Sequence, residues 1–369
     1  MIQMDMSKFL VDAYFVEHEH AARYMMGSSD PESLRLCDAI KDFGKYGGES
    51  LGYPLDGYRP LLEKLTRLYK TVTPEQIAVM NGGEETIYVT MRALLNKGDE
   101  VVVHTPCFQS LSVIAEEIGC EMKYYRPSFE KGWEFDFPLL ESLVSDKTKM
   151  VVLNYPHNPT GACLTAADME KIVRLCKAHG AYLVSDEMYR FLCLDPAYST
   201  ESFADLYDSA VALGGFSKTF AAPGLRLGWV ATKNPALMKK LLAYRHFTST
   251  CTNLVSQLVA AELLDRAEAI IQRNNSIVQR NYQLFQDFAG KHRQLFAYAP
   301  PKGATMVYVK LLNGQTSMDF CMEILEHTGV LMVPSSVLEA SDEYIRVGMG
   351  RESFQECVRL VDDYLSRKN

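Results

Sequence analysis

The chain has 369 residues, 47% hydrophobic and 23% charged, which is the balance of an ordinary globular protein with room for one large and one smaller domain. Its net charge of −8 argues against nucleic acid as the main partner, because a phosphate backbone requires a basic face. The nine cysteines are scattered, the first twelve residues do not form a secretory signal, and no window approaches the roughly 20 apolar residues of a membrane span. We therefore expect a cytoplasmic protein with reduced thiols.

Helix and strand patterns alternate from about residue 58. The sequence predicts helices over residues 58–69, 84–96 and 167–179, and strands over residues 77–80, 100–104, 150–154, 181–185, 210–213 and 228–231. Continuous apolar runs are typical of strands buried on both faces, and their alternation with helices is typical of a mostly parallel sheet flanked by helices. We therefore expect an α/β fold that binds its ligands at the carboxyl ends of these strands.

The pattern changes beyond about residue 254. A long helical stretch over residues 254–289 precedes a strand over 305–309 and helices over 318–326 and 354–365, which together indicate a smaller α+β domain. The first 50 residues show turn signals but no strand ladder, and we expect them to pack against the C-terminal part. We therefore predict an N-terminal arm over residues 1–50 that contributes to the small domain, a large domain over 51–253 and a small domain over 254–369.

Lys218 lies in the most informative stretch of the chain, residues 214–229. It stands in a short Ser/Gly turn after the predicted strand 210–213, and Arg226 follows eight residues later. An amine at this place suits a covalent bond to an aldehyde, and the aldehyde that we consider is pyridoxal phosphate (PLP). We therefore ask whether each other physical requirement of PLP has a candidate residue.

A phosphate requires backbone N–H groups at a helix N-terminus. The turn Asn81-Gly82-Gly83-Glu84 follows a predicted strand and opens a predicted helix, and Arg226 could add a charged contact to the same phosphate. Glycine-rich turns between a strand and a helix are also common without any ligand. The turn by itself leaves both interpretations open.

The cofactor ring requires a carboxylate beside its nitrogen, partners for its phenolic oxygen and a stacking face. Asp186 after the strand 181–185 suits the nitrogen, although such a residue is often only a turn cap. Asn158, in an Asn-Pro-Thr-Gly turn, and Tyr189 suit the oxygen, while Phe108 could stack or belong to the core. Arg346 lies in an apolar run where an unpaired charge is costly, which favours a role in binding the substrate carboxylate.

These residues, in this order, resemble the class I/II aminotransferase family, the aspartate aminotransferase superfamily of fold-type I PLP enzymes. The resemblance covers nearly the whole chain. It rests on the following elements: Tyr53-x-x-x-Gly57, Gly82-Gly83, Pro106-x-Phe108, Asn158-Pro159-Thr160-Gly161, Asp186-x-x-Tyr189, Ser217-Lys218, Pro223-Gly224-x-Arg226 and Arg346. It implies a large PLP domain, a small domain built from both chain ends, and a homodimer with shared active sites.

The resemblance also implies a role for each matching residue. Lys218 would bond to PLP and then act as the general base, Asp186 would pair with the ring nitrogen, and Arg346 would bind the substrate carboxylate. The remaining cofactor contacts would come from Gly83, Glu84, Ser217 and Arg226 at the phosphate, from Asn158 and Tyr189 at the phenolic oxygen, from Phe108 by stacking, and from Tyr53 at the phosphate of the neighbouring subunit.

Three positions depart from the family pattern. Gly215 stands where a serine is frequent, which removes one phosphate hydroxyl. Glu84 occupies a position that is often small or amide-bearing, so we expect its N–H alone to contribute. Phe108 replaces a tyrosine or tryptophan and keeps only the stacking face.

The reaction that follows from these residues has two versions. The first is transamination between an L-amino acid and a 2-oxo acid. The second is a PLP lyase or cyclase acting at the β- or γ-carbon, because residues 105–112, 155–161 and 223–229 are similar to capreomycidine synthase, a PLP enzyme that cyclises a hydroxylated arginine. A PLP-sensing regulator would need a DNA-binding region, for which residues 1–50 leave no room. Neither Arg245 nor Arg23 is a clear partner for a side-chain carboxylate, so the substrate stays open.

Overall fold

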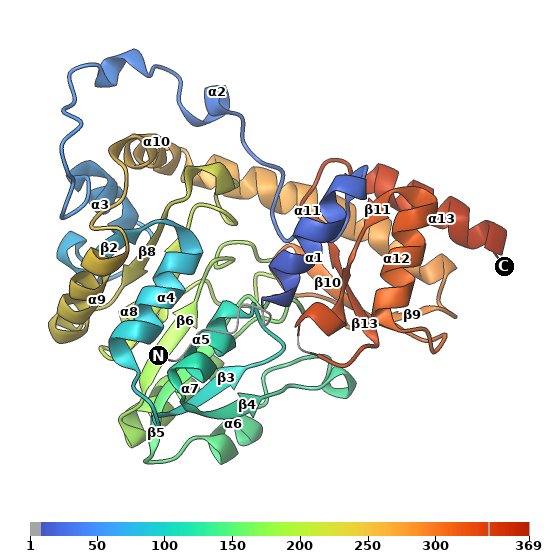
Figure 1. The fold of residues 1–369 in the computed structure, drawn as a ribbon, viewed down its shortest axis with the longest axis horizontal. Helices are drawn as coiled ribbons and strands as arrows, with labels where there is room; N and C mark the ends of the chain where they lie inside the picture. Colours follow the sequence, from blue (N-terminus) through green and yellow to red (C-terminus); the bar gives the residue numbers. More distant parts are fainter. Residues whose placement is uncertain (1–8, 339, 369) are drawn as a thin grey trace.

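Residues 9–338 and 340–368 are described by a computed structural model (Figure 1). Its α-helices are α1 (Leu10–His18), α2 (Leu36–Ala39), α3 (Arg59–Thr66), α4 (Gly82–Leu94), α5 (Ser110–Ile118), α6 (Phe137–Leu143), α7 (Ala166–His179), α8 (Phe203–Leu206), α9 (Pro235–Thr248), α10 (Leu254–Leu264), α11 (Ala267–Lys291), α12 (Ser317–Thr328) and α13 (Phe354–Lys368). Its strands are β1 (Tyr24–Met25), β2 (Ile77–Met80), β3 (Glu100–His104), β4 (Glu121–Tyr125), β5 (Thr148–Asn154), β6 (Tyr182–Asp186), β7 (Ala210–Gly215), β8 (Gly228–Ala231), β9 (Phe296–Tyr298), β10 (Met306–Leu311), β11 (Val330–Leu331), β12 (Val333–Pro334) and β13 (Tyr344–Gly348).

The larger sheet has seven strands in the order β2-β8-β7-β6-β5-β3-β4. Strand β8 runs antiparallel to both of its neighbours, and the pairs from β7 to β4 are parallel. All four residues of β2 and all five residues of β3 are buried, as expected for the apolar sequence of β2 and for the three central valines of β3. The expected α/β fold with a mostly parallel sheet is therefore confirmed.

Helices cover both faces of this sheet. Helices α4, α5 and α9 pack on one face, α6 and α7 pack on the other, and α3 and α10 pack near β2. Helix α7 shows how the sequence encodes this arrangement, since it begins at a reciprocal capping box between Thr165 and Asp168 and ends at Gly180 with φ of 65°. Its buried face includes Ile172 and Cys176, and each buried aliphatic side chain contributes about 1.5–3 kcal/mol.

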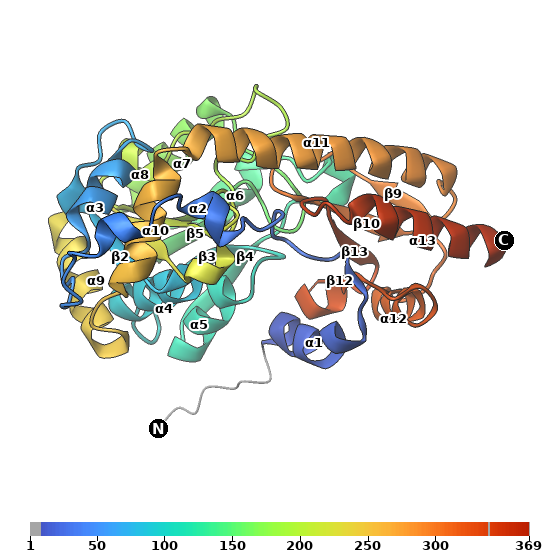
Figure 2. The same cartoon turned by 90° about the horizontal axis from the view of Figure 1, so that it is seen from above.

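The smaller sheet is antiparallel in the order β12-β13-β10-β9, and it packs with α11, α12 and α13 (Figure 2). The two chain ends meet beside it, because β1 pairs in parallel with β11 and the Tyr14 hydroxyl donates to the Met332 carbonyl oxygen at 2.9 Å. Helix α1 and β1 therefore pack on the C-terminal part, whereas the assignment of all of residues 1–50 to the small domain stays a prediction.

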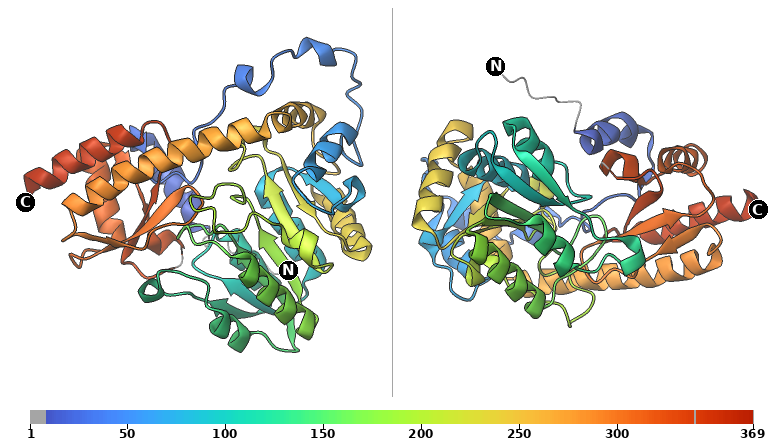
Figure 3. Two further views of the ribbon diagram at one scale, coloured as in Figure 1. Left: turned by 180° about the vertical axis from the view of Figure 1, so that it is seen from behind. Right: turned by 90° about the horizontal axis from the view of Figure 1, so that it is seen from below.

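The single helix expected over residues 254–289 is in fact two helices. Helix α10 ends at Leu264 and α11 begins at Ala267, because Arg266 leaves helical geometry with φ of −124° and ψ of 22°. Polar contacts hold this break, since Arg266 donates to the Ala39 carbonyl oxygen at 2.7 Å and Lys64 bonds Asp265 at 2.6 Å. Helix α10 packs with the larger sheet, and α11 continues to the smaller one (Figure 3). The domain boundary at residue 254 stays a prediction.

Residues 36–55 form an extended arm that arches over α10 (Figure 1). Lys45 in this arm donates a hydrogen bond to Glu262 of α10 at 2.6 Å, yet Leu51 and Tyr53 are each 83% exposed.

In the described ranges, no helix combines the length and apolar character that a membrane crossing needs.

Candidate active site

A cavity of about 330 Å³ lies at the carboxyl ends of β5, β6 and β7, where the chain ends approach the larger sheet. Every residue that we selected from the sequence contributes to its wall except Tyr53, which is exposed on the arm. The selected residues that line it are Gly83, Glu84, Phe108, Asn158, Asp186, Tyr189, Ser217, Lys218, Arg226 and Arg346.

Asp186 ends β6 with its carboxyl group buried. The Met188 N–H donates to its Oδ1 at 3.1 Å, and the Asn154 amide donates to its carbonyl oxygen at 3.0 Å. Burial raises the pKa of Asp186 to about 7, although the positive charge of Lys218 acts in the opposite direction. Within the described chain this carboxyl group has no ion pair, so it is ready to receive a cationic partner from a ligand.

Lys218 follows β7 in the turn that the sequence predicted. Its Nζ donates to the Ser29 hydroxyl at 2.8 Å and to Asp30 Oδ1 at 2.5 Å. Burial by itself would lower the pKa of the Lys218 amine, but the Tyr189 phenol oxygen and the Asp30 carboxylate outweigh burial, and the pKa is raised. Asp30 shows the reciprocal effect: burial raises the pKa of its carboxyl group, but the contact with Lys218 lowers it below its ordinary value.

The helix α4 begins at the glycine turn, and its first N–H groups are free of intrahelical partners. Gly82 has φ of 83°, and a Cβ atom there would lie 2.9 Å from the Arg226 guanidinium, so this position requires glycine. Arg226 is held by a hydrogen bond to the Pro223 carbonyl oxygen at 3.1 Å. The side chain of Glu84 accepts a hydrogen bond from the Ser110 hydroxyl at 2.6 Å, and burial raises its pKa.

Met188 explains why Gly215 replaces the frequent serine. A Cβ atom at position 215 would lie 2.7 Å from Met188 Sδ, and a Cβ atom at Gly83 would lie 2.9 Å from Met188 Cε. The thioether therefore fills the space that a serine side chain would use. The sequence marks the missing serine, but only the packing shows what has taken its place.

Arg346 lies in the middle of β13 and is only 2% exposed. Its guanidinium donates to Asn158 Oδ1 at 3.1 Å and to the Gly27 carbonyl oxygen at 3.2 and 3.0 Å. Burial lowers its pKa, and the described residues give it no direct ion pair. A buried guanidinium held only by neutral oxygens retains its charge for an anionic ligand.

Tyr189 is buried and donates from its hydroxyl to the Ser29 carbonyl oxygen at 3.4 Å. Phe108 is half-buried and packs against the core formed with α4 and α5. The residues that we expected to bind the phosphate, the ring and the substrate carboxylate therefore line one cavity. In this structure each of them contacts other residues of the protein.

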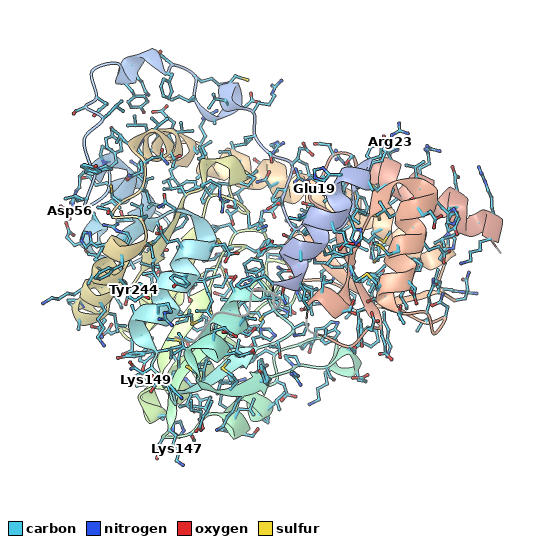
Figure 4. The ribbon with its side chains drawn as sticks, in the orientation of Figure 1. Glu19, Arg23, Asp56, Lys147, Lys149 and Tyr244 are labelled. Atoms are coloured by element: carbon cyan, nitrogen blue, oxygen red, sulfur yellow. The ribbon has the colours of Figure 1, made fainter. Side chains whose placement is uncertain are left out.

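The sequence did not predict the part of this wall that comes from the N-terminal residues. We call residues 27–30 the N-terminal strap. Ser29 and Asp30 line the cavity, together with Val11, Asp12 and Phe15 from α1. The only local signal was the Ser-Ser-Asp-Pro turn, which does not indicate a contact with Lys218. By contrast, Arg245 is a structural residue that donates to the Val79 and Leu55 carbonyl oxygens, and the exposed Arg23 lies on the outer edge beside α1 (Figure 4).

Comparisons with known proteins agree with this geometry. The sequence profile described as Aminotransferase class I and II matches residues 23–362. An aspartate aminotransferase of Sulfurisphaera tokodaii is 28% identical over 353 residues, which are 91% of this chain and 87% of that protein. Capreomycidine synthase of Streptomyces vinaceus is 29% identical over 272 residues, 74% of this chain and 69% of that protein. The crystal structure of a PLP-dependent aminotransferase from Streptococcus suis has a TM-score of 0.92 and 28% identity, covering 100% of this chain and 99% of that one.

Proposed function

Because the chain belongs to the aminotransferase class I and II family, and is thereby a PLP-dependent aminotransferase, we propose that it moves an amino group between an L-amino acid and a 2-oxo acid in the cavity around Lys218. The observation that carries this proposal is that Lys218 and the buried Asp186 face the same cavity as Arg346. An amine, a carboxyl group without a cationic partner and a guanidinium are the three charged groups that this reaction needs.

The donor set of the cavity fits PLP. The carboxyl group of Asp186 is buried, and its pKa is raised to about 7. A cationic ring nitrogen beside it would lower this pKa again. Gly83, Ser217 and Arg226 surround the start of α4, where an anionic phosphate is favoured. The other residues that would hold the cofactor are Glu84 through its N–H, Asn158 and Tyr189 at the phenolic oxygen, Phe108 against the ring face, and Tyr53 from a neighbouring subunit.

When bound, PLP supplies an electron-withdrawing ring that stabilises the negative charge left at Cα when its proton is removed. Arg346 binds the α-carboxylate of the amino acid through two parallel hydrogen bonds and so fixes the position of Cα. Lys218 accepts the proton from Cα and later donates a proton on the cofactor side, as a general base and then a general acid. Asp186 keeps the ring nitrogen cationic throughout.

We also propose a homodimer that acts in the cytoplasm. The arm exposes Leu51 and Tyr53, and Phe247 near the end of α9 is 89% exposed. A second copy of the chain covering this region would bury them and bring Tyr53 towards the neighbouring cavity. None of the nine cysteines, all of which lie in the described ranges, forms a disulfide bond, which suits a reducing compartment.

Borohydride trapping tests the central step. The protein is loaded with PLP, reduced and digested, and the modified peptide is identified by mass. We expect the label on Lys218 and no label there in a Lys218→Ala variant. Without an added oxo acid, a reactive amino acid should convert the bound cofactor to its amine form, which is seen as a loss of the visible absorbance band. Labelling of another lysine would refute the assignment of Lys218.

A lyase or cyclase reaction is the second candidate, and the similarity to capreomycidine synthase favours it. Removal of the Cα proton precedes either outcome, so the cavity residues alone do not separate them. Product analysis does: exchange of the amino group with a 2-oxo acid supports transamination, whereas ammonia release or a cyclised product supports the alternative. A panel of amino donors with one fixed oxo acid will identify the substrate class.

A further inference from the structure

Asp30 is a carboxylate of the cavity wall that lies outside the motifs on which the family resemblance rests. Its Oδ1 accepts a hydrogen bond from Lys218 Nζ at 2.5 Å, although 188 residues separate the two in sequence. The side chains of Asp30 and Lys218 are 27% and 22% exposed, so both are largely shielded from water. An ion pair in such surroundings is far stronger than one on the surface.

The backbone of the N-terminal strap holds Asp30 in place. The Gly27 N–H donates to the Leu331 carbonyl oxygen at 2.8 Å, and the Glu32 N–H donates to the Gly350 carbonyl oxygen at 2.7 Å. Between these anchors, the Thr305 hydroxyl donates to the Ser29 carbonyl oxygen at 2.7 Å. The backbone that carries Asp30 is therefore anchored to residues of the C-terminal part of the chain, independently of the contact with Lys218.

Several other charged groups face this pair. Arg351 Nη2 lies 3.8 Å from Asp30 Oδ2, and Arg346 also acts on both partners. Tyr189 faces both Asp30 and Lys218, while Asp186 and Glu84 face Lys218 from the larger sheet. Of the three carboxylates that face Lys218, namely Asp30, Asp186 and Glu84, Asp30 accepts the hydrogen bond from the Lys218 nitrogen.

We propose that Asp30 is a positioning residue that holds the Lys218 nitrogen towards the strap and favours its cationic form, both in the free protein and when that nitrogen is bonded to the cofactor. This inference rests on the proposed function. Its consequence for catalysis is direct, because the proton that Lys218 accepts from Cα creates a cation, and Asp30 stabilises that cation. Asp30 therefore tunes Lys218 as a base without contacting the substrate's reacting atoms.

The first test is a spectroscopic titration of the PLP-loaded protein, whose visible absorbance depends on protonation of the Lys218 nitrogen. Asp30→Asn keeps the size of the side chain and an acceptor oxygen but removes the charge, and we expect it to lower the titration midpoint by about one unit or more. Asp30→Glu should restore most of the midpoint. Asp12→Asn removes another carboxylate from the cavity wall, one without a hydrogen bond to Lys218, and should leave the midpoint within a few tenths.

The second test needs no cofactor. Acetic anhydride acetylates only neutral amines, and mass spectrometry reports the rate at each lysine. At pH 8 we expect Asp30→Asn to accelerate acetylation of Lys218 about tenfold relative to the exposed Lys147 in the same sample. If Asp30→Asn does not fold, Asp30→Ser serves as a second uncharged variant, and it should accelerate acetylation of Lys218 relative to Lys147 by a similar factor.

The outcomes separate the two hypotheses. If the protein forms no reducible bond with PLP, the proposed function fails, while the acetylation rates still report on Asp30. If PLP binds but Asp30→Asn leaves both the titration midpoint and the acetylation rate unchanged, the role of Asp30 is refuted. An equal shift in Asp12→Asn would also overturn it, because the effect would then belong to the general negative field of the cavity.

Discussion

Replacing Asp186 with asparagine measures how much the ionised carboxylate in the cavity lowers the free energy of unfolding. Burial raises the pKa of Asp186 from 3.8 to about 7 in the folded protein. Between these two values the unfolded chain has already released the proton that the folded protein still holds, so the free energy of unfolding falls as pH rises. A difference of about three pH units corresponds to about 4 kcal/mol, and all of it is lost above pH 7.

The cofactor-free Asp186→Asn protein should therefore be up to about 4 kcal/mol more stable than the wild type at pH 8, and the difference should shrink towards zero near pH 4. Urea unfolding followed by circular dichroism at several pH values measures this difference directly. Glu141→Gln, which removes an exposed carboxylate of α6, serves as the control. A stability difference that does not change with pH would show that Asp186 is not the buried acid described here.

The same variant tests the role of Asp186 towards PLP. If its carboxylate pairs with the ring nitrogen, PLP should raise the unfolding free energy of the wild type by more than that of Asp186→Asn, because a ligand stabilises in proportion to its affinity for the folded state. Asp186→Asn should then raise the unfolding free energy of the cofactor-free protein, and this gain should be smaller when PLP is bound. Equal stabilisation of both proteins by PLP would refute the pairing.

Three further predictions concern the rest of the site. Arg346→Lys should raise the KM for the amino acid about tenfold or more, since lysine cannot form two parallel hydrogen bonds with a carboxylate, and steady-state kinetics with an unchanged KM would contradict this. Gly215→Ser should lower the unfolding free energy by about 0.5–1.5 kcal/mol, because the flexible end of the Met188 side chain has to turn into a less favourable rotamer, and the same substitution in a Met188→Ala background should cost less. Tyr53→Phe should weaken PLP binding in equilibrium dialysis by about 1.5–3 kcal/mol, the worth of a hydrogen bond to a charged group, and an unchanged affinity in the dimer would remove Tyr53 from the site.

The residues that sequence reasoning identified most securely are those that follow a strand. Asn158 and Lys218 come soon after β5 and β7, and Asp186 ends β6, which lies between these two strands in the sheet. Because the carboxyl ends of parallel strands meet at one edge, their positions along the chain were enough to predict that they share a cavity. The same local logic predicted six of the seven strands of the larger sheet, since apolar runs have few other places in a globular fold. It missed β4, an edge strand whose sequence Glu-Met-Lys-Tyr-Tyr is not an apolar run and is only partly buried.

Features that depend on packing between distant segments could not be predicted from the sequence. The break between α10 and α11 lies in a pattern that stays helical in composition, and Arg266 leaves the helix where its guanidinium binds the arm at Ala39. The sequence indicates only that Gly215 lacks the hydroxyl of a serine, whereas the structure shows that Met188 occupies the space where a side chain at position 215 would lie. In both cases the local pattern was compatible with two structures, and a contact from elsewhere in the chain decided between them.

Asp30 is the strongest example of this limit, because nothing in its neighbourhood points to Lys218. Its position follows from three separate events: β1 pairs with β11, Arg346 binds the Gly27 carbonyl oxygen, and Thr305 binds the Ser29 carbonyl oxygen. Each involves a partner more than 200 residues away, so no periodicity or motif could reveal it. The charge that faces the Lys218 amine is therefore set by how the two chain ends fold together, and comparison of the Lys218 motif alone would not detect a difference in the pKa of this amine between two related proteins.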